Sequence, residues 1–228
     1  WAREADYDGV QLAASNAKLL HQFVSRTYNR RTDRFGGDVA GRARILVEWS
    51  TTESFQNARR VRGPETGPAA GYTARIDLTG LPAGQRIFYR VQFEDPAEPR
   101  SLSLPAAGTF LSAPGSPRDL TFAWSADTAG QGWGINPEWG GLRMYDTMRR
   151  AQPDFFIHCG DTIYADAPIQ SEVALPDGTT WRNIVTPAKS KAAETLEDFR
   201  GNYLYNLLDG HMRRFNAEIP QFVLWDDH

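Results

Sequence analysis

The residues best suited to chemistry in this sequence are a carboxylate and a phenol three positions apart, in Gly160-Asp161-Thr162-Ile163-Tyr164. They follow an apolar run, Phe155-Phe156-Ile157, that is typical of a buried strand. A strand that ends in Gly-Asp brings the carboxylate to the rim of a sheet, where it can bridge two cations. The tyrosine can bind at the same point as phenolate, a hard anionic oxygen that suits ferric iron better than Ca²⁺ or Mg²⁺. The spacing therefore indicates a metal site.

Two more polar motifs follow apolar runs of their own. Asp127 comes shortly after Leu120–Trp124, and Asp227-His228 follows Pro220–Trp225. Because ligands of open α/β sheets bind beyond the carboxyl ends of the strands, we expect these side chains to lie near Asp161. A bridging carboxylate that holds two cations about 3.5 to 4 Å apart is suited to hydrolysis of phosphate esters.

Each of these residues also has an ordinary structural interpretation. An aspartate such as Asp127 commonly caps a turn. A tyrosine such as Tyr164 is often a half-buried aromatic residue. Asp226-Asp227 is compatible with a solvated acidic pair, and His158 and Cys159 are expected to pack or hydrogen-bond within the strand. The order of the motifs, each one behind its own strand, favours the metal site.

The elements that must position these motifs form a strand, helix, strand unit, which predicts a parallel sheet covered on both faces. The expected helices are Leu142–Ala151 and one or two amphipathic helices within Ala192–Phe215, with Leu196, Phe199, Tyr203 and Leu207 on the apolar side. Ala165–Lys191 is expected to be mostly loop. Four tryptophans are expected to pack in the core: Trp124, Trp133, Trp139 and Trp225.

The first half of the sequence has a different period. Ile45–Trp49, Tyr72–Leu78 and Arg86–Phe93 largely alternate apolar with polar residues, which predicts a small antiparallel β-sandwich over residues 45–114. A Ser/Pro/Gly linker over residues 112–117 precedes the α/β part, residues 115–228. In residues 1–44 a first strand is expected, yet Val10–Val24 has the pattern of a weak amphipathic helix and the rest is aperiodic. The predicted fold class is thus α+β/α/β, in three segments.

The motifs together resemble the alkaline phosphatase D (PhoD-like) family, a branch of the calcineurin-like metallophosphoesterases. The resemblance covers residues 45–228, and it includes a turn and tyrosine-bearing strand similar to those of fibronectin type III-like domains. Its motifs are Gly160–Tyr164, Asp127 in an Asp-x-x-Gly turn, Trp225–His228, Gln131–Gly141, Phe199–Tyr203, and Leu78–Pro82 followed by Tyr89–Val91.

The resemblance implies a role for each matching residue. Asp127 and Tyr164 would bind Fe³⁺, and Asp161 would bridge it to a second metal. Asp227 stands where related enzymes have an asparagine ligand of the second metal, and the family implies Ca²⁺ there. His228 stands near the phosphate and leaving group and would be the catalytic residue. The implied activity is that of an alkaline phosphatase or phosphodiesterase in which a metal-bound hydroxide attacks phosphorus.

The resemblance has limits in this sequence. The histidines that complete the second metal sphere in the family come from later strands, so we expect an N-terminal fragment that is inactive on its own. The family implies a periplasmic or secreted bacterial protein. We expect a monomer whose substrate is a small phosphate ester or a phospholipid or wall-polymer diester. The residues leave open the preference for monoesters or diesters.

Charge and composition exclude other partners. The net charge is -3 and the basic residues are scattered, which argues against nucleic acid. No apolar run approaches the length of a membrane span, and a single cysteine rules out an internal disulfide framework. One alternative from another class remains: a cell-surface binding or structural protein that uses the fibronectin-like module and carries a vestigial metal site.

Overall fold

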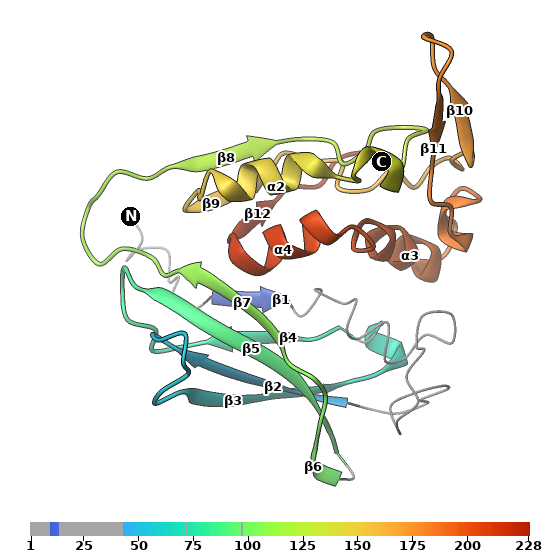
Figure 1. Ribbon diagram of the computed structural model, residues 1–228. Helices are drawn as coiled ribbons and strands as arrows, with labels where there is room; N and C mark the ends of the chain where they lie inside the picture. Colours follow the sequence, from blue (N-terminus) through green and yellow to red (C-terminus); the bar gives the residue numbers. More distant parts are fainter. Residues whose placement is uncertain (1–9, 14–42, 72, 97) are drawn as a thin grey trace. The chain divides into compact units, whose positions relative to one another are not determined.

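The computed structural model describes residues 10–13, 43–71, 73–96 and 98–228. The chain divides into two compact units, residues 1–119 and 120–228 (Figure 1). Each unit has its own sheet, antiparallel in the first and parallel in the second. The structure is thus of mixed α/β type.

In the first unit the main sheet has five strands in the order β3-β2-β5-β6, with β7 also paired to β5. A separate antiparallel pair joins β1 to β4. The unit also contains one short 3-10 helix, η1. The bounds are β1 Val10–Ala13, β2 Ala43–Ser50, β3 Arg59–Thr66, η1 Pro68–Ala70, β4 Arg75–Leu78, β5 Arg86–Asp95, β6 Glu98–Leu102 and β7 Ala106–Leu111.

The core of the first unit lies between two layers. Alternate residues of β2, Ile45, Val47 and Trp49, are buried against Ile76 and Leu78 of β4. Leu46 and Glu48, which lie between them, are also buried, so both faces of β2 are buried and not one face as its alternation predicts. The strands predicted over Ile45–Trp49 and Arg86–Phe93 are confirmed as parts of β2 and β5, and the strand predicted over Tyr72–Leu78 is confirmed over Arg75–Leu78.

The predicted helix over Val10–Val24 is wrong for its first residues, since Val10–Ala13 form β1. Val10 pairs with Leu78 and Ala13 with Arg75, so the backbone hydrogen bonds of this segment go to a strand more than sixty residues away. Such pairing overrides a weak local period. The rest of the predicted helix, and most of the segment 1–44, lies outside the described residues.

The second unit is built on a three-stranded sheet in the order β12-β9-β8, and both strand pairs are parallel. The parallel sheet predicted from the strand, helix, strand pattern is thus confirmed. The excursion between β9 and α3 contains a β-hairpin whose turn is the Pro-Asp-Gly at 176–178. The bounds are β8 Phe122–Ser125, η2 Pro137–Trp139, α2 Arg143–Arg150, β9 Phe155–His158, β10 Glu172–Ala174, β11 Thr180–Arg182, η3 Pro187–Lys189, α3 Leu196–Asn206, α4 Gly210–Glu218 and β12 Gln221–Val223.

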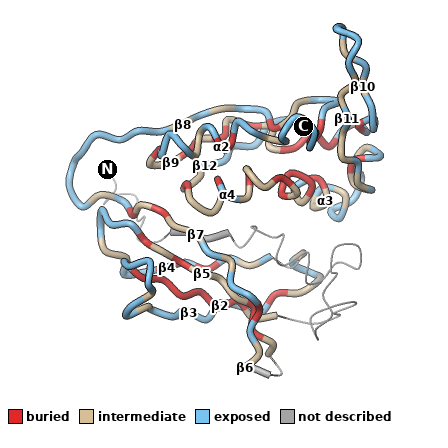
Figure 2. Tube along the Cα trace, viewed as in Figure 1, coloured by how far each residue is buried: buried red, intermediate tan, exposed pale blue. Residues whose placement is uncertain are grey.

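One face of this sheet is covered and the other is not, within the described part of the chain. Fully buried Phe156 packs edge-on against Tyr145 of α2 and Phe215 of α4, with ring centroids 6.5 and 5.1 Å away. On the opposite face Phe122 and Trp124 are exposed, as the colouring of β8 shows in Figure 2. The expectation that both faces are covered is therefore wrong, because α2 and α4 lie against the same face.

The four tryptophans expected in the core are also exposed. Their exposed fractions range from 36% for Trp133 to 90% for Trp225. Within the ranges that the structure describes, no helix combines the length and the apolar character that crossing a membrane requires.

Candidate metal centre

The candidate site lies where the three parallel strands end. The loops after β8, β9 and β12 carry Asp127, Asp161 and the pair Asp227-His228 respectively. Backbone hydrogen bonds join these loops to one another. The Asp127 N–H donates to the Gly160 carbonyl over 3.2 Å, and the Ala165 N–H donates to the His228 carbonyl over 3.4 Å. The sheet topology therefore brings all three motifs to one edge.

Local backbone geometry turns the two upstream carboxylates out of their strands. Asp127 and Asp161 both adopt left-handed conformations, with φ of 57° and 52°. Aspartate tolerates this region better than most residues because its short polar side chain can hydrogen-bond locally. Gly160 has a φ of 111° and leaves no room for a side chain, since an added Cβ would lie 2.6 Å from Oδ2 of Asp226. A glycine is thus required directly before Asp161.

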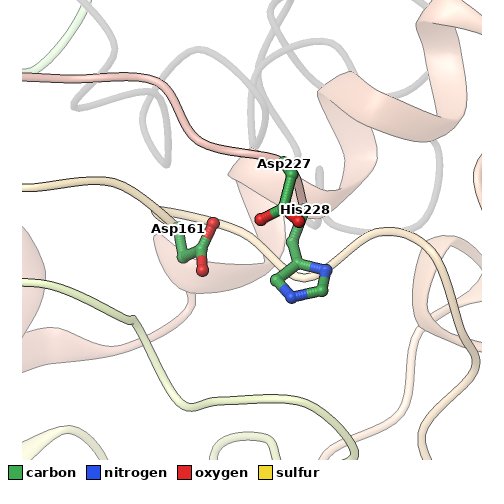
Figure 3. Close-up of side chains that lie close together, drawn as sticks. All are labelled: Asp161, Asp227 and His228. Atoms are coloured by element: carbon green, nitrogen blue, oxygen red, sulfur yellow. The ribbon is translucent and has the colours of Figure 1, made fainter.

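Three of the predicted residues form a compact cluster of possible ligands. Asp161, Asp227 and His228 each offer one ligand atom, and these atoms all lie within 4.8 Å of one another (Figure 3). Asp161 lies opposite Asp227 and His228 in this view. The set of carboxylate oxygens and an imidazole nitrogen is suited to a hard or borderline cation.

Tyr164 links the remaining residue to this cluster. Its hydroxyl donates a hydrogen bond to Oδ1 of Asp127 and lies 3.3 Å from Oδ2 of Asp161. The hydrogen bond to Asp127, together with burial and the charge of both aspartates, raises the pKa of Tyr164. A phenolate here therefore needs a compensating positive charge, which a cation between Tyr164 and the carboxylates would supply.

The burial of Asp161 gives an independent indication of a missing partner. Its Oδ1 atom is buried and accepts no hydrogen bond from the residues that the structure describes. An unsatisfied buried polar atom costs about 1–3 kcal/mol, and more when the group is charged. A cation at this atom would remove that penalty, so the residues present fit a metal. Asp127 and Asp227, by contrast, are exposed.

His228 is oriented by contacts on two sides. Its Nδ1 atom lies 3.1 Å from Oδ2 of Asp166, and its ring lies 4.7 Å from that of Tyr164. Although burial lowers the pKa of His228, the hydrogen bond and charge of Asp166 outweigh it and raise that pKa. Asp166 has no motif of its own, and it meets His228 across 62 positions of chain.

A buried lysine supports the other side of Tyr164. Lys189, 5% exposed, donates from Nζ to the Tyr164 carbonyl over 2.7 Å, and its ammonium lies 5.3 Å from the ring centre of Tyr205. The Ile169 N–H in turn donates to the Lys189 carbonyl over 2.9 Å. These hydrogen bonds hold the segment 165–191 next to the site. Sequence analysis gave Lys189 no role.

All five predicted site residues therefore lie together. Asp161, Asp227 and His228 share one cluster, and Asp127 joins it through Tyr164. The expectation that His158 packs or hydrogen-bonds is confirmed, since its Nε2 lies 2.9 Å from the hydroxyl of Thr128. Their individual roles as metal ligands and as a catalytic residue remain predictions.

Comparison with curated proteins finds similarity at the start of the chain. Residues 1–52 match the NADH:flavin oxidoreductase / NADH oxidase family. Putative 12-oxophytodienoate reductase 9 of Oryza sativa subsp. japonica is 49% identical over 47 residues, which are 21% of this chain and 11% of that protein. NADH-dependent flavin oxidoreductase nadA of Aspergillus parasiticus is 50% identical over 44 residues, 19% of this chain and 10% of that protein. The chain thus spans about a tenth of these relatives, and sequence analysis missed this similarity.

The site region matches a different family. The structure of PhoD superposes on this chain with a TM-score of 0.63 and 24% identity, covering 85% of this chain and 34% of that one. This likeness shows a shared fold. The model of the PhoD-like phosphatase family matches residues 122–228, the range that contains β8, β9, β12 and every residue of the candidate centre. Residues 122–228, nearly all of the second unit, are therefore similar to the PhoD-like phosphatase family.

Proposed function

We propose that the second unit contributes to metal-dependent hydrolysis of phosphate esters. The observation that carries this proposal is the convergence of Asp161, Asp227 and His228 within 4.8 Å, at a point where Asp161 has a buried oxygen without a partner. The match of residues 122–228 to PhoD-like phosphatases supports the reaction class. An alkaline phosphatase or phosphodiesterase activity fits both observations.

We further propose that the site holds two cations, Fe³⁺ and a divalent ion such as Ca²⁺. Asp127 and Tyr164 would hold the iron, Asp227 would hold the divalent ion, and Asp161 would lie between them. Bound metals would neutralise charge on the phosphoryl group and acidify the attacking water. The phenol of Tyr164 supports iron, because a phenolate oxygen suits a trivalent ion.

The protein's own groups would perform the remaining steps. Asp166 orients the imidazole of His228 through Nδ1, which leaves Nε2 free to face a substrate. His228 would give its proton to the leaving oxygen, in the manner of a general acid. Asp166 would keep that imidazole oriented and favour its protonated form.

The first unit and the location of the protein are part of the same proposal. For residues 45–114 we propose a fibronectin type III-like module, which the two-layer antiparallel arrangement around Ile45, Val47 and Ile76 supports. Resemblance to PhoD-like proteins supports a periplasmic or secreted location.

The test compares two equivalent substitutions in the full chain. Asp161→Asn keeps the shape of the side chain but removes the charge that would hold two metals, whereas Asp119→Asn makes the same change at an exposed position. We expect wild type and Asp119→Asn to retain iron through gel filtration and to release p-nitrophenol slowly from p-nitrophenyl phosphate or its diester. Asp161→Asn should lose most of the iron and the hydrolysis. Equal iron content and turnover in all three proteins would refute the proposal.

A further inference from the structure

Thr128 is the residue where three parts of the second unit meet. Its hydroxyl lies 2.8 Å from the hydroxyl of Tyr145 in α2 and 2.9 Å from Nε2 of His158 at the end of β9. Its backbone N–H donates to the carbonyl of Asp161 over 2.8 Å. Thr128 also directly follows Asp127 in the chain. It therefore contacts or adjoins both turns that carry the upstream carboxylates.

The hydrogen bonds of this group are shielded from water. Thr128, Tyr145 and His158 are 4%, 7% and 3% exposed. A hydroxyl has one proton to donate, so an arrangement in which Tyr145 donates to Thr128 and Thr128 donates to His158 uses both hydroxyl protons. In a buried network of this kind, loss of one member leaves the others unsatisfied.

The position of the network explains what it adds to the site. Asp127 and Asp161 adopt left-handed backbone conformations, which cost free energy in residues other than glycine and persist where the surroundings hold them. Two further backbone bonds join these turns, from the Cys159 N–H to the Ser125 carbonyl at 2.7 Å and from the Asp127 N–H to the Gly160 carbonyl at 3.2 Å. Thr128 directly follows Asp127, and its backbone N–H donates to the Asp161 carbonyl. It therefore connects the two turns at the residues that carry the carboxylates.

We propose that Thr128 is a positioning residue of the metal centre. Its hydroxyl, fixed between Tyr145 and His158, sets the separation of the Asp127 and Asp161 carboxylates and thereby the affinity of the site for metal. The inference rests on the proposed function, since it assigns a supporting residue to that same site. Groups that orient metal ligands from behind typically change metal affinity by about 10- to 100-fold when they are removed.

A matched pair of substitutions separates the hydroxyl from the packing. Thr128→Val keeps the volume and the branched shape but leaves Tyr145 and His158 without their shared partner. Thr128→Ser loses a methyl group but keeps the hydroxyl. A purely structural role predicts that both variants bind metal as wild type does once folded, whereas a positioning role predicts that only Thr128→Val differs.

The experiment titrates the full-length metal-free chain with Fe³⁺ supplied as citrate and records visible absorption. We expect Thr128→Val to bind Fe³⁺ about 10- to 100-fold more weakly than wild type, with a displaced tyrosinate band. Thr128→Ser should retain both the affinity and the band position. Circular dichroism checks that each variant is folded.

Three outcomes overturn the inference in different ways. Binding by wild type that is undiminished and spectrally unchanged in Thr128→Val refutes the positioning role alone. Absence of Fe³⁺ binding by the wild-type chain refutes the proposed function, and the inference with it. If Thr128→Val does not fold, Tyr145→Phe removes one arm of the network at nearly constant volume. Unchanged Fe³⁺ affinity in Tyr145→Phe then overturns the inference.

Discussion

The phenol of Tyr164 gives the site its most specific residue-scale prediction. In the metal-free chain its pKa is raised, first by the hydrogen bond to Asp127. Ferric iron would displace that proton and form a tyrosinate, whose charge-transfer band absorbs visible light. We expect iron-loaded wild type to be coloured at neutral pH and Tyr164→Phe to be colourless and at least about tenfold weaker in Fe³⁺ binding, a loss of about 1.4 kcal/mol. Visible absorption during an iron titration measures both effects.

An exposed tyrosine provides the control for this experiment. Tyr203 lies on α3 and is 44% exposed, so Tyr203→Phe should leave the colour and the affinity unchanged. A visible band of wild-type intensity in Tyr164→Phe would remove tyrosine from the iron site.

Residues of the candidate centre differ in how well sequence alone predicts them. Asp127, Asp161 and Asp227 were predictable because each follows an apolar run, and parallel strands end at one edge. Thr128 and Lys189 were not, because their roles depend on partners that no local pattern specifies. Thr128 meets His158 across 30 positions, and Lys189 meets the Tyr164 carbonyl across 25.

At the scale of elements, the turn after β9 depends on Gly160. Gly160→Ala introduces a Cβ at a φ of 111° and places it 2.6 Å from Oδ2 and 2.7 Å from Cβ of Asp226. We expect the variant to lose more than about 1 kcal/mol of unfolding free energy, since an alanine at positive φ is strained. It should also lose iron binding, because the displaced loop carries Asp227. Chemical denaturation and the iron titration measure the two losses.

Gly178→Ala is the control that introduces backbone strain without a steric clash. Its φ is 84°, and an added Cβ would meet nothing within 4 Å. Gly178→Ala should therefore be destabilised by backbone strain but bind iron normally. Normal iron binding by Gly160→Ala would show that the close approach of residue 160 to Asp226 does not determine the affinity for iron.

The start of α3 provides a prediction with a defined pH dependence. Thr195 and Asp198 form a capping box, in which Asp198 also receives a hydrogen bond from Lys191. These bonds, that from Lys191 first, hold the pKa of Asp198 well below its ordinary value. A carboxylate with a lowered pKa stabilises the fold above its unfolded pKa of about 3.9, and this contribution is lost as the pH falls below that value. We therefore expect Asp198→Asn to be less stable than wild type at pH 7, with a difference that narrows on acidification.

Thermal unfolding at pH 7 and at low pH measures this difference. Glu197→Gln removes a neighbouring acidic charge from the same helical turn but breaks no capping bond, so it controls for interaction with the helix dipole. A difference for Asp198→Asn that stayed constant with pH, or that Glu197→Gln reproduced, would contradict the assignment.

The orientation of α3 shows why sequence pattern failed at this scale. Leu196, Phe199 and Tyr203 were expected on its buried side, yet all three are exposed. The buried side instead carries Asn202 and Asn206, whose amides donate to the carbonyls of Ala188 and Thr162 over 3.2 and 2.6 Å. The helix packs against loop backbone, which presents hydrogen-bond acceptors, so polar residues occupy the face that an apolar period would assign to leucine and phenylalanine.

At the scale of the molecule, the two family matches fall on separate parts of the chain. Residues 1–52 match flavin oxidoreductases, and residues 122–228 match PhoD-like phosphatases. The first match includes β2, whose residues pair with β3 and β5 from the region between the two matches. Sequence pattern identified β2 through its alternation but not the family of the residues before it, because those residues show no clear period.

The division into two units leads to a prediction for the unfolding of the full chain. The buried cluster around Ile45 and Ile87 belongs entirely to the first unit, whereas the candidate metal centre belongs entirely to the second. A ligand that binds only one folded unit stabilises that unit, by about 2.7 kcal/mol when its concentration is a hundred times the dissociation constant. We expect scanning calorimetry to show two transitions, of which Fe³⁺ raises only one.

The variant Asp161→Asn assigns the transition that responds. With the bridging carboxylate removed, neither transition should move when Fe³⁺ is added, although both should still be present. A single transition, or two that iron raises equally, would mean that the units unfold together, and metal binding at one sheet edge would then stabilise the whole chain. If the two units unfold independently, the metal raises the stability of the second unit alone, because the strand ends of that unit supply its ligands.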